Sequence, residues 1–472
     1  MSATRASNDG PRGVRCFPLA CLRGAALPVL VGLCLVSAAC STPTASTGDS
    51  APDTSVQRLE MAARYSAAHA GDALLVWADG QLVLERAQNG YNLDRPHMLA
   101  SGTKSFVGVA ALAAAADGVL ALDERVAETI RTWQDDPQRS SITVRQLLHL
   151  TSGLDPGGAG RAPTFDGALQ VPVLDPPGTT FRYGPTAFQV FGALLQRKLG
   201  GEDPRRYIER RLFDPLEMQV GGWAYVDGQD PQLAGGARLR ARDWLRFGRL
   251  LLNNGQWNGT SVVPASRLDA LVRPAAASPG YGLTVWLNAA VDTSSAFFEH
   301  APRTLQPDGP QGMIYNDGPR DLYMAAGLFN QRLYVIPSRN MVVVRLGRAD
   351  PTWSDAEFLA RLLDGRPYQA TARKRLPLEE RVALLATLRM QRLDAAVSLT
   401  DAQENAVRPI VERQLRELNT IRREPRPGAL LRLRALQRRT DRAIEAELTA
   451  GQREAYRSFR AEQRREAGWR RR

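Results

Sequence analysis

Alternating apolar positions near the two ends of the central region predict strands, and longer apolar runs between them predict helices. Residues 73–86 read ALLVWADGQLVLER, in which two apolar runs flank Asp79-Gly80, a dipeptide typical of tight β-hairpin turns. Residues 332–347, RLYVIPSRNMVVVRLG, predict two further strands joined by a turn. Because strands lie at both ends of the region, we expect one sheet in which the N-terminal and C-terminal strands are neighbours.

The helices between these strands are predicted from apolar periodicity and from their end signals. Residues 106–120, FVGVAALAAAADGVL, form an Ala-rich apolar run typical of a buried helix, and residues 240–259 are amphipathic and stop at Asn and Gly. Ser354 followed three residues later by Glu357 is a capping box that predicts the start of a last helix. We therefore expect an α/β domain over residues 57–366.

The last hundred residues differ from this domain in charge and in pattern. Residues 371–472 carry 25 Lys and Arg against 14 Asp and Glu, an excess of +11 in a chain whose net charge is +12. Helical periodicity runs through them, and Leu-Thr-x-x-Gln occurs at residues 399–403 and 448–452, each a capping box. We expect residues 367–378 to be a linker and residues 379–472 a separate basic all-α module.

The first 56 residues carry signals for export. An apolar stretch at residues 24–39, GAALPVLVGLCLVSAA, follows basic residues, and Cys40 comes next in a setting that resembles a bacterial lipobox, although Ser37 replaces the usual Leu. We expect residues 1–39 to be a signal peptide, Cys40 to be lipidated, and residues 40–56 to be a flexible tether. An ordinary cleaved signal or a short membrane anchor is the alternative.

Cysteine and histidine usage excludes several kinds of site. None of the four cysteines follows Cys40, so a disulfide or a cysteine metal site in the folded body is excluded. The four histidines are scattered without ligand spacing, and we expect no metal and no cofactor. Export argues against a nucleic-acid partner despite the positive net charge. We expect the bacterial cell envelope, on the periplasmic face, with a lipid anchor in the membrane.

Lys104 is the residue that most directly suggests chemistry. Of the 61 basic side chains only three are lysines, and Lys104 lies one helical turn after Ser101 in Ser101-Gly-Thr-Lys104. Residues three apart share a helix face, and a buried lysine loses its proton whereas an arginine does not. The pattern is that of a Ser-x-x-Lys nucleophile pair, and a chance match is the alternative.

Several segments together resemble one family over roughly residues 60–365. SGTKSF, TVRQLLHLTSGL, PGTTFRYGP, WNGTSVVP and the VIP-turn-VVVRLG hairpin are similar, in this order, to motifs of the serine β-lactamase-related hydrolases. That family includes class C β-lactamases, D-alanyl-D-alanine carboxypeptidases, family VIII esterases and 6-aminohexanoate-dimer hydrolases. The resemblance implies a β-lactamase/transpeptidase-like fold, an antiparallel sheet flanked by helices with a helical subdomain.

The resemblance also implies roles for individual residues. Ser101 matches the nucleophile, Lys104 the general base or proton relay, and Tyr183 the tyrosine of the second motif. The Ser101 N–H would be one oxyanion-hole donor, and the other is expected near Ala325. We also consider Asn330 and Gln331 as residues that line the substrate site.

Two departures from the family pattern bear on the substrate. Gly184 and Pro185 follow Tyr183 where the second motif ends in Asn, and residues 322–327, LYMAAG, lack the Lys or His of the third motif. We therefore expect a carboxylic ester or a small amide as substrate. A penicillin-binding protein that recognises β-lactams or D-Ala peptides is one alternative, and a retired hydrolase that binds partners or acts as a chaperone is another.

The repeated Leu-Thr-x-x-Gln motif resembles the Spy/CpxP-type periplasmic proteins, which are helical dimers. The resemblance makes homodimerisation through residues 379–472 an expectation. The basic charge of these helices predicts an acidic protein, anionic lipid or cell-wall polymer as a partner. Two well-capped helices without such a role are the alternative.

Overall fold

The structure, a computed structural model, describes residues 54–158, 162–292, 297, 312–367, 378–423 and 429–469. The predicted signal peptide, Cys40, nearly all of the tether and nearly all of the 367–378 linker lie outside these residues. Within the described ranges, no helix combines the length and the apolar content needed to cross a bilayer.

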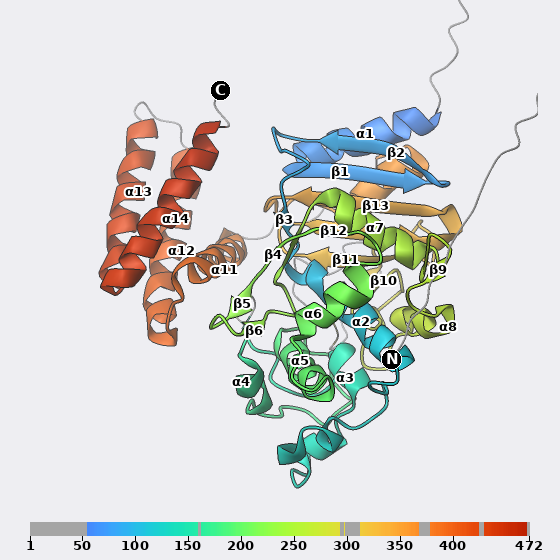
Figure 1. Ribbon diagram of the computed structural model, residues 1–472. Helices are drawn as coiled ribbons and strands as arrows, with labels where there is room; N and C mark the ends of the chain where they lie inside the picture. The colour runs from blue at the N-terminus through green and yellow to red at the C-terminus, as the bar shows by residue number, and fades with distance from the viewer. Residues whose placement is uncertain are drawn as a thin grey trace, which may run out of the picture. The chain divides into compact units, whose positions relative to one another are not determined.

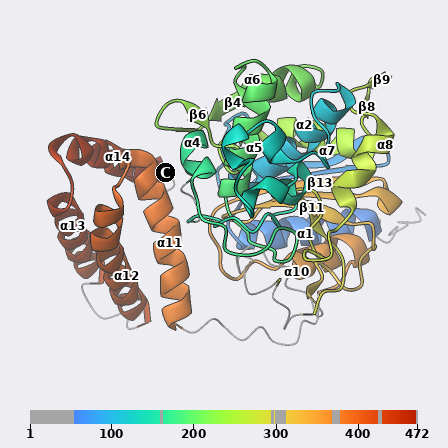
Figure 2. The same cartoon turned by 90° about the horizontal axis from the view of Figure 1, so that it is seen from below.

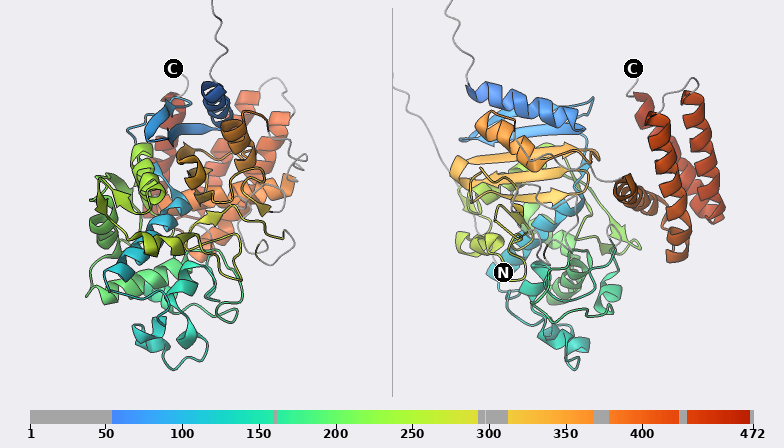
Figure 3. Two further views of the ribbon diagram at one scale, coloured as in Figure 1. Left: turned by 90° about the vertical axis from the view of Figure 1, so that its right-hand side faces the viewer. Right: turned by 180° about the vertical axis from the view of Figure 1, so that it is seen from behind.

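A six-stranded antiparallel sheet is the centre of the first part of the chain (Figure 1). Its strand order is β10-β11-β12-β13-β1-β2. The first and last segments of the domain pair directly, because β1 lies antiparallel to β13 (Figure 3). The expected neighbourhood of N-terminal and C-terminal strands is therefore confirmed. The six strands are Gly71–Ala78 (β1), Gln81–Ala87 (β2), Trp286–Leu287 (β10), Tyr323–Gly327 (β11), Gln331–Ile336 (β12) and Met341–Gly347 (β13).

The predicted hairpin turn connects β1 to β2. Ala78 pairs with Gln81, which leaves Asp79 and Gly80 as a two-residue loop. Both loop residues have positive φ, +49° and +83°, as the tight turns that match strand twist require. This turn brings β2 back beside β1.

Helices cover both faces of the sheet (Figure 2). One face carries α7 (Ala241–Leu252) and α2 (Lys104–Ala116), and the other carries α1 (Thr54–Ala68) and α10 (Asp355–Leu359). Helix α7 packs closely because Gly248 has no side chain: a Cβ there would lie 2.5 Å from the Val342 side chain. The fold is thus the β-lactamase/transpeptidase-like arrangement that the resemblance implied.

Apart from α5, the remaining elements of this part are short. The helical ones are Ala100–Thr103 (η1), Val126–Glu128 (η2), Arg131–Trp133 (η3), Arg139–Ser141 (η4), Val144–Leu148 (α3), Phe165–Leu169 (α4), Thr186–Lys198 (α5), Pro204–Ile208 (α6), Glu209–Phe213 (η5), Ala265–Leu268 (α8), Asp269–Val272 (η6), Pro337–Arg339 (η8) and Ala360–Asp364 (η9). The strands are His97–Met98 (β3), Val220–Trp223 (β4), Tyr225–Val226 (β5), Asp230–Pro231 (β6), Ala237–Leu239 (β7), Gln256–Trp257 (β8) and Thr260–Ser261 (β9).

The N-cap predicted at the last helix of this part is confirmed, but the capping box is only half formed, because the Ser354 N–H donates to the Tyr65 hydroxyl at 3.1 Å instead of to Glu357. The Glu357 N–H donates to Ser354 Oγ at 3.1 Å, so α10 begins where the sequence predicts. Gly365, with a φ of +69°, ends the helical segment that follows α10.

The described residues from 378 onward form helices with their own buried core. The helices are Leu378–Val397 (α11), Asp401–Arg423 (α12), Ala429–Ala446 (α13) and Ala450–Trp469 (α14). Their apolar side chains form a cluster separate from that of the sheet, with Ala386 and Val407 fully buried in it. The expected all-α character of this segment is confirmed.

The two Leu-Thr-x-x-Gln motifs bind each other at the starts of α12 and α14. The Thr400 and Thr449 N–H groups donate to Gln403 Oε1 and Gln452 Oε1, each at 3.0 Å, as capping boxes require. The two glutamines also pair: Gln403 Nε2 donates to Gln452 Oε1 at 2.8 Å, and Gln452 Nε2 to Gln403 Oε1 at 3.0 Å. The repeat therefore joins two distant helix starts, which the capping pattern alone did not predict.

Candidate active site

The turn that carries Ser101 leads directly into the buried helix α2. Ala100 precedes Ser101 with a φ of +47°, a conformation that costs free energy for a residue with a side chain. Thr103 stabilises the turn, because its hydroxyl donates to the Ala100 carbonyl at 2.7 Å and accepts from the Ala237 N–H at 3.1 Å. The Ala-rich helix α2, which follows this turn, is almost wholly buried, and its packing fixes the position of Ser101.

Lys104 and Ser101 meet as the spacing predicts. Lys104 Nζ lies 3.1 Å from Ser101 Oγ and donates to the Ala234 carbonyl at 2.9 Å. The lysine is only 3% exposed, and this burial lowers its pKa from the usual 10.5 to about 7. A large share of Lys104 is therefore a neutral amine at neutral pH, able to accept the Ser101 proton.

Tyr183 comes from the loop before α5 and completes the cluster. Its phenol hydrogen-bonds to Ser101, and Lys104 Nζ lies 4.8 Å from the centre of its ring. Burial raises the pKa of Tyr183, and the Ser101 hydrogen bond and the charge of Arg332 only partly oppose this. Tyr183 is thus a neutral phenol at neutral pH, suited to passing a proton on, while Lys104 is the group that accepts one.

Aromatic side chains surround Tyr183 and account for its burial. Its ring stacks on Trp286 at a centroid distance of 5.7 Å and meets Tyr281 edge-on at 6.1 Å. Phe181 and Phe297 pack against the same group. Sequence reasoning missed Trp286 and Tyr281, because only the fold brings β10 beside the Tyr183 loop.

Gln189 is a second residue that sequence reasoning missed. It is fully buried on α5, where its amide accepts from the Leu233 N–H at 3.1 Å and donates to the Pro163 carbonyl at 3.0 Å. Leu233 precedes Ala234, whose carbonyl binds Lys104. Gln189 therefore holds the loop that positions the lysine, and a polar residue on a buried helix face was its only signal.

The two residues after Tyr183 depart from the second motif in different ways. A side chain at Gly184 is excluded, because a Cβ there would lie 2.0 Å from the Pro156 carbonyl oxygen. Pro185 caps the start of α5 and has no polar side chain. The loop thus brings Tyr183 to Ser101 without the amide that the family motif carries.

Strand β11 borders the nucleophile turn. A Cβ on Gly327 would lie 2.0 Å from the Leu99 carbonyl oxygen and 3.1 Å from the Gly102 nitrogen, so the strand backbone touches the turn around Ser101. Only Tyr323 and Met324 pair with β10, which leaves the end of β11 with an open edge on that side. Main-chain amides at this edge are the natural partners for an oxyanion formed at Ser101.

The strand register moves the second expected donor away from Ala325. The Asn288 N–H donates to the Leu322 carbonyl at 3.0 Å, which fixes residue 322 as facing the β10 side. Since alternate residues of an antiparallel strand face opposite sides, the Ala325 N–H faces β12, whereas the N–H groups of Ala326 and of Leu328, the residue just after β11, face the open edge. Of these two, the Leu328 N–H belongs to the peptide that begins at Gly327, the residue that lies against the nucleophile turn. The geometry therefore replaces Ala325 by Leu328 as the candidate second donor.

Asn330 and Gln331 have a different role from the one expected. Asn330 Nδ2 donates to the Asp350 carbonyl at 2.9 Å, and Gln331 Nε2 donates to the Gly347 carbonyl at 2.7 Å. Gln331 is fully buried and also binds the carbonyls of the β11–β12 turn. Both amides brace this turn in place of the predicted substrate-lining role.

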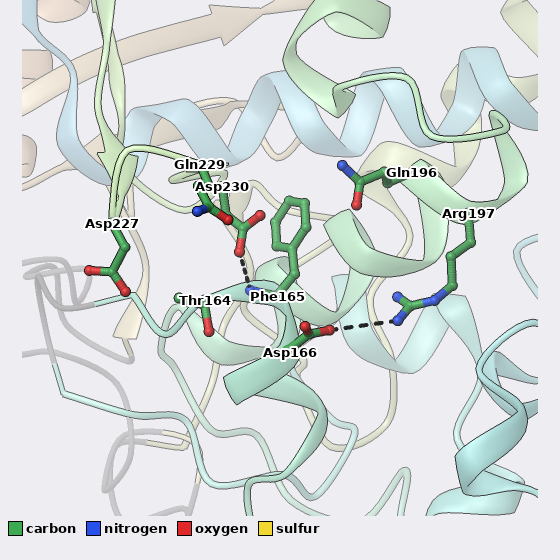
Figure 4. A pocket seen from close by; sticks show the side chains of 8 residues that line it. All are labelled: Thr164, Phe165, Asp166, Gln196, Arg197, Asp227, Gln229 and Asp230. Carbon is green, nitrogen blue, oxygen red and sulfur yellow. Dashed lines mark hydrogen bonds and ion pairs between the residues drawn. The ribbon is translucent and has the colours of Figure 1, made fainter.

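A separate polar pocket of about 470 Å³ lies beside α4, α5 and the β5–β6 hairpin (Figure 4). Asp166 lies 3.7 Å from Arg197, and Asp230 accepts from the Phe165 N–H at 2.7 Å. Ser101, Lys104 and Tyr183 are not among its lining residues, so it is distinct from the candidate site. The pocket is lined by Thr164, Phe165, Asp166, Gln196, Arg197, Asp227, Gln229 and Asp230.

In the part of the chain that the structure describes, no group of three His, Cys, Asp or Glu is arranged to hold a metal ion.

Comparison with known proteins identifies the family. A family model described as Beta-lactamase matches residues 56–365. The chain belongs to the beta-lactamase family. A search of the curated proteins found no match.

Solved structures share the fold of this family member. A novel penicillin-binding protein homolog from Caulobacter crescentus is 14% identical with a TM-score of 0.51, over 66% of this chain and 96% of its own. EstCE1, a hydrolase with promiscuous acyltransferase activity, is 16% identical with a TM-score of 0.50, over 66% of this chain and 98% of its own. These likenesses show the fold, and the family match over residues 56–365 confirms the resemblance drawn from the motifs of residues 60–365.

Proposed function

We propose that this beta-lactamase family member is a serine hydrolase that forms an acyl-enzyme on Ser101 with a carboxylic ester or small amide. The observation that carries the proposal is the buried Lys104 amine, 3.1 Å from Ser101 Oγ and with a pKa lowered to about 7. A retired scaffold gains nothing from a buried lysine held beside a serine, because that burial costs stability. The intact cluster thus favours catalysis over a binding role.

In the acylation step, Ser101 Oγ attacks the substrate carbonyl carbon while its proton moves to the neutral Lys104 amine. The carbonyl oxygen becomes an oxyanion between the Ser101 and Leu328 N–H groups. The tetrahedral intermediate collapses as the bond to the leaving alcohol or amine breaks. Tyr183 donates its phenol proton to the leaving oxygen or nitrogen and recovers a proton from the Lys104 ammonium, which returns the lysine to its neutral form.

Deacylation repeats these steps with water as the nucleophile. Water attacks the acyl carbon and transfers a proton to the Lys104–Tyr183 pair. The bond to Ser101 Oγ breaks, the serine regains its proton, and the carboxylic acid leaves. Each proton is therefore accounted for by Lys104 and Tyr183.

The surroundings of the site favour a neutral acyl group. Ala325 and Ala326 stand on β11 where the third motif carries a cation, and neither binds a substrate carboxylate. Arg332, on the neighbouring strand, is already bound to Asp355 and is 1% exposed. Since β-lactams and D-Ala peptides present a carboxylate, an uncharged ester or small amide suits the site better.

The test is Ser101→Ala in the purified soluble protein. We expect hydrolysis of p-nitrophenyl butyrate to fall by at least about 10⁴-fold, because the nucleophile is lost, with the thermal midpoint preserved. Intact-mass analysis of the wild type should show a transient acyl adduct on Ser101. Unchanged turnover in the variant would refute the assignment. A lasting nitrocefin adduct would favour the penicillin-binding alternative, and no turnover or adduct with either substrate would favour the retired scaffold.

We extend the proposal to the chain ends. The signal-like residues 1–39 and Cys40 support an exported lipoprotein on the periplasmic side of the cell envelope. The excess of basic residues after 371 supports an acidic protein, anionic lipid or cell-wall polymer as the partner of the helices. Homodimerisation through these helices is also part of the proposal, on the strength of the repeated Leu-Thr-x-x-Gln motif alone.

Cys40→Ala tests the anchor. In bacteria fed a clickable fatty acid, we expect the wild type to carry the label and to fractionate with membranes, and the variant to lose both. Cys34→Ala, in the segment to be removed, is the matched control and should keep the label. Equal labelling of the wild type and Cys40→Ala would contradict the lipoprotein assignment.

A further inference from the structure

A buried ion pair lies directly behind the strand that borders the nucleophile. Arg332 on β12 is 1% exposed and binds Asp355 of α10 through two nitrogens, with Nε–Oδ1 at 2.7 Å and Nη2–Oδ2 at 3.1 Å. Trp353 Nε1 donates to the same carboxylate at 3.1 Å, and the Tyr334 hydroxyl also binds it. The guanidinium is therefore held in one orientation by a fully formed network.

The third nitrogen of this guanidinium reaches β11. Arg332 Nη1 donates to the Gly327 carbonyl at 3.2 Å and to the Gln331 carbonyl at 3.0 Å. The Gly327 carbonyl and the Leu328 N–H belong to one planar peptide group and point in opposite directions. A hydrogen bond from Arg332 to that carbonyl therefore acts on the peptide whose N–H faces the open edge beside Ser101.

Two physical effects follow from this contact. A cationic donor on the carbonyl draws electron density from the peptide, which makes its N–H a stronger donor, since hydrogen bonds in series reinforce one another. The contact also fixes the plane of the peptide, so the N–H needs no reorientation when negative charge develops. The charge of Arg332 also lowers the pKa of Tyr183, which shows that its field extends to the site.

We propose that Arg332 is a positioning residue for the oxyanion hole, which orients and polarises the Gly327–Leu328 peptide from the far side of the sheet. The inference rests on the proposed acyl transfer at Ser101. Arg332 touches no reacting atom and acts only through Leu328. Strand β11 lacks the Lys or His of the third motif. Arg332, on the neighbouring strand β12, instead places its guanidinium against the Gly327 carbonyl at the end of β11.

The variants must separate this role from simple stabilisation. Arg332→Lys keeps a charge for Asp355 but has one nitrogen, which cannot span both Asp355 and the Gly327 carbonyl. Arg332→Gln with Asp355→Asn removes both charges together, so no unpaired charge stays buried. Arg345→Gln is the matched control, because Arg345 is also fully buried and binds the same turn at the Asn330 carbonyl, at 2.7 Å, and not Gly327.

The readout is the carbonyl stretch of the acyl-enzyme, measured by rapid-mixing infrared difference spectroscopy with a ¹³C-carbonyl-labelled p-nitrophenyl ester. A weaker oxyanion hole polarises the carbonyl less, so we expect a higher stretching frequency in both Arg332 variants. Because the donor is weakened and not removed, we expect kcat to fall on the order of ten-fold with KM nearly unchanged. Arg345→Gln should keep the wild-type frequency even where its thermal midpoint falls.

The outcomes distinguish this inference from the proposed function. A wild type that forms no Ser101 acyl-enzyme overturns the proposed function and the inference with it. A wild type that acylates, with the same carbonyl frequency in wild type and both Arg332 variants, overturns only the positioning role. An equal frequency shift in Arg345→Gln also overturns it, because bracing of the turn would then explain the effect. If the double variant does not fold, Arg332→Lys alone decides.

Discussion

Replacing Lys104 by arginine is expected to lower kcat/KM by roughly 10²–10⁴-fold, the contribution of a positioned general base. Lys104 Nζ lies 3.1 Å from Ser101 Oγ, and its pKa is lowered to about 7 by burial. Arginine keeps a positive charge at this position, but it does not release its proton at any pH where the protein is folded. Ser101 would then lack a base, and steady-state kinetics with a p-nitrophenyl ester measures the loss.

The chain offers a matched control in Lys198. Lys198 is the last residue of α5, and its amine lies 2.9 Å from the Glu124 carboxylate, with which it forms an ion pair. Lys198→Arg keeps a cation beside Glu124, away from the Ser101 cluster, and should therefore leave kcat/KM within about two-fold of the wild-type value. If Lys104→Arg retained wild-type activity while remaining folded, the general-base role would be refuted.

The second large effect is expected from Gly327→Ala. A Cβ at this position would lie 2.0 Å from the Leu99 carbonyl oxygen. To relieve this clash, either β11 or the main chain at Leu99 must shift, and either shift changes the distance between β11 and the turn that carries Ser101. Such a shift separates the Ser101 N–H from the open edge of β11. We expect kcat to fall about 10²–10³-fold, as for loss of one oxyanion donor, together with a lower thermal midpoint.

The same chemical change at an open glycine provides the comparison. Nothing lies within 4 Å of a Cβ built on Gly451, and it sits in helix α14, where alanine is the better helix former. Gly451→Ala should therefore leave kcat unchanged. A Gly327→Ala protein with wild-type kcat would show that the close contact of β11 with the nucleophile turn does not matter for the reaction.

The elements that the sequence predicted are those with local causes. The Asp79-Gly80 turn, the Ser354 N-cap and the Ala-rich helix after Ser101 each depend on residues a few positions apart, and the structure contains all three. The Ser101–Lys104 contact is also local, because one helical turn separates the two residues. Tyr183 is distant in sequence, and the family resemblance located it.

The features that the sequence did not predict depend on register and on burial of distant segments. Ala325 and Leu328 differ in the side of β11 that their N–H groups face, and only the pairing with β10 fixes that. Asn330 and Gln331 are polar residues near a turn, a pattern that suits either a binding site or a brace. Arg332 looks like any exposed arginine of a strand until Asp355 of α10 is placed against it.

The most direct test of the central claim is the pH dependence of Ser101 labelling by an uncharged fluorophosphonate. Below its pKa of about 7, Lys104 is protonated and accepts no proton, so labelling should be slow; it should rise through pH 7 and level off above it. Tyr183 adds no step in this range, because its pKa is raised. The account predicts a labelling rate with its half-maximum near pH 7, absent in Lys104→Arg. A half-maximum near the ordinary lysine value, or an identical profile in Lys104→Arg, would contradict it.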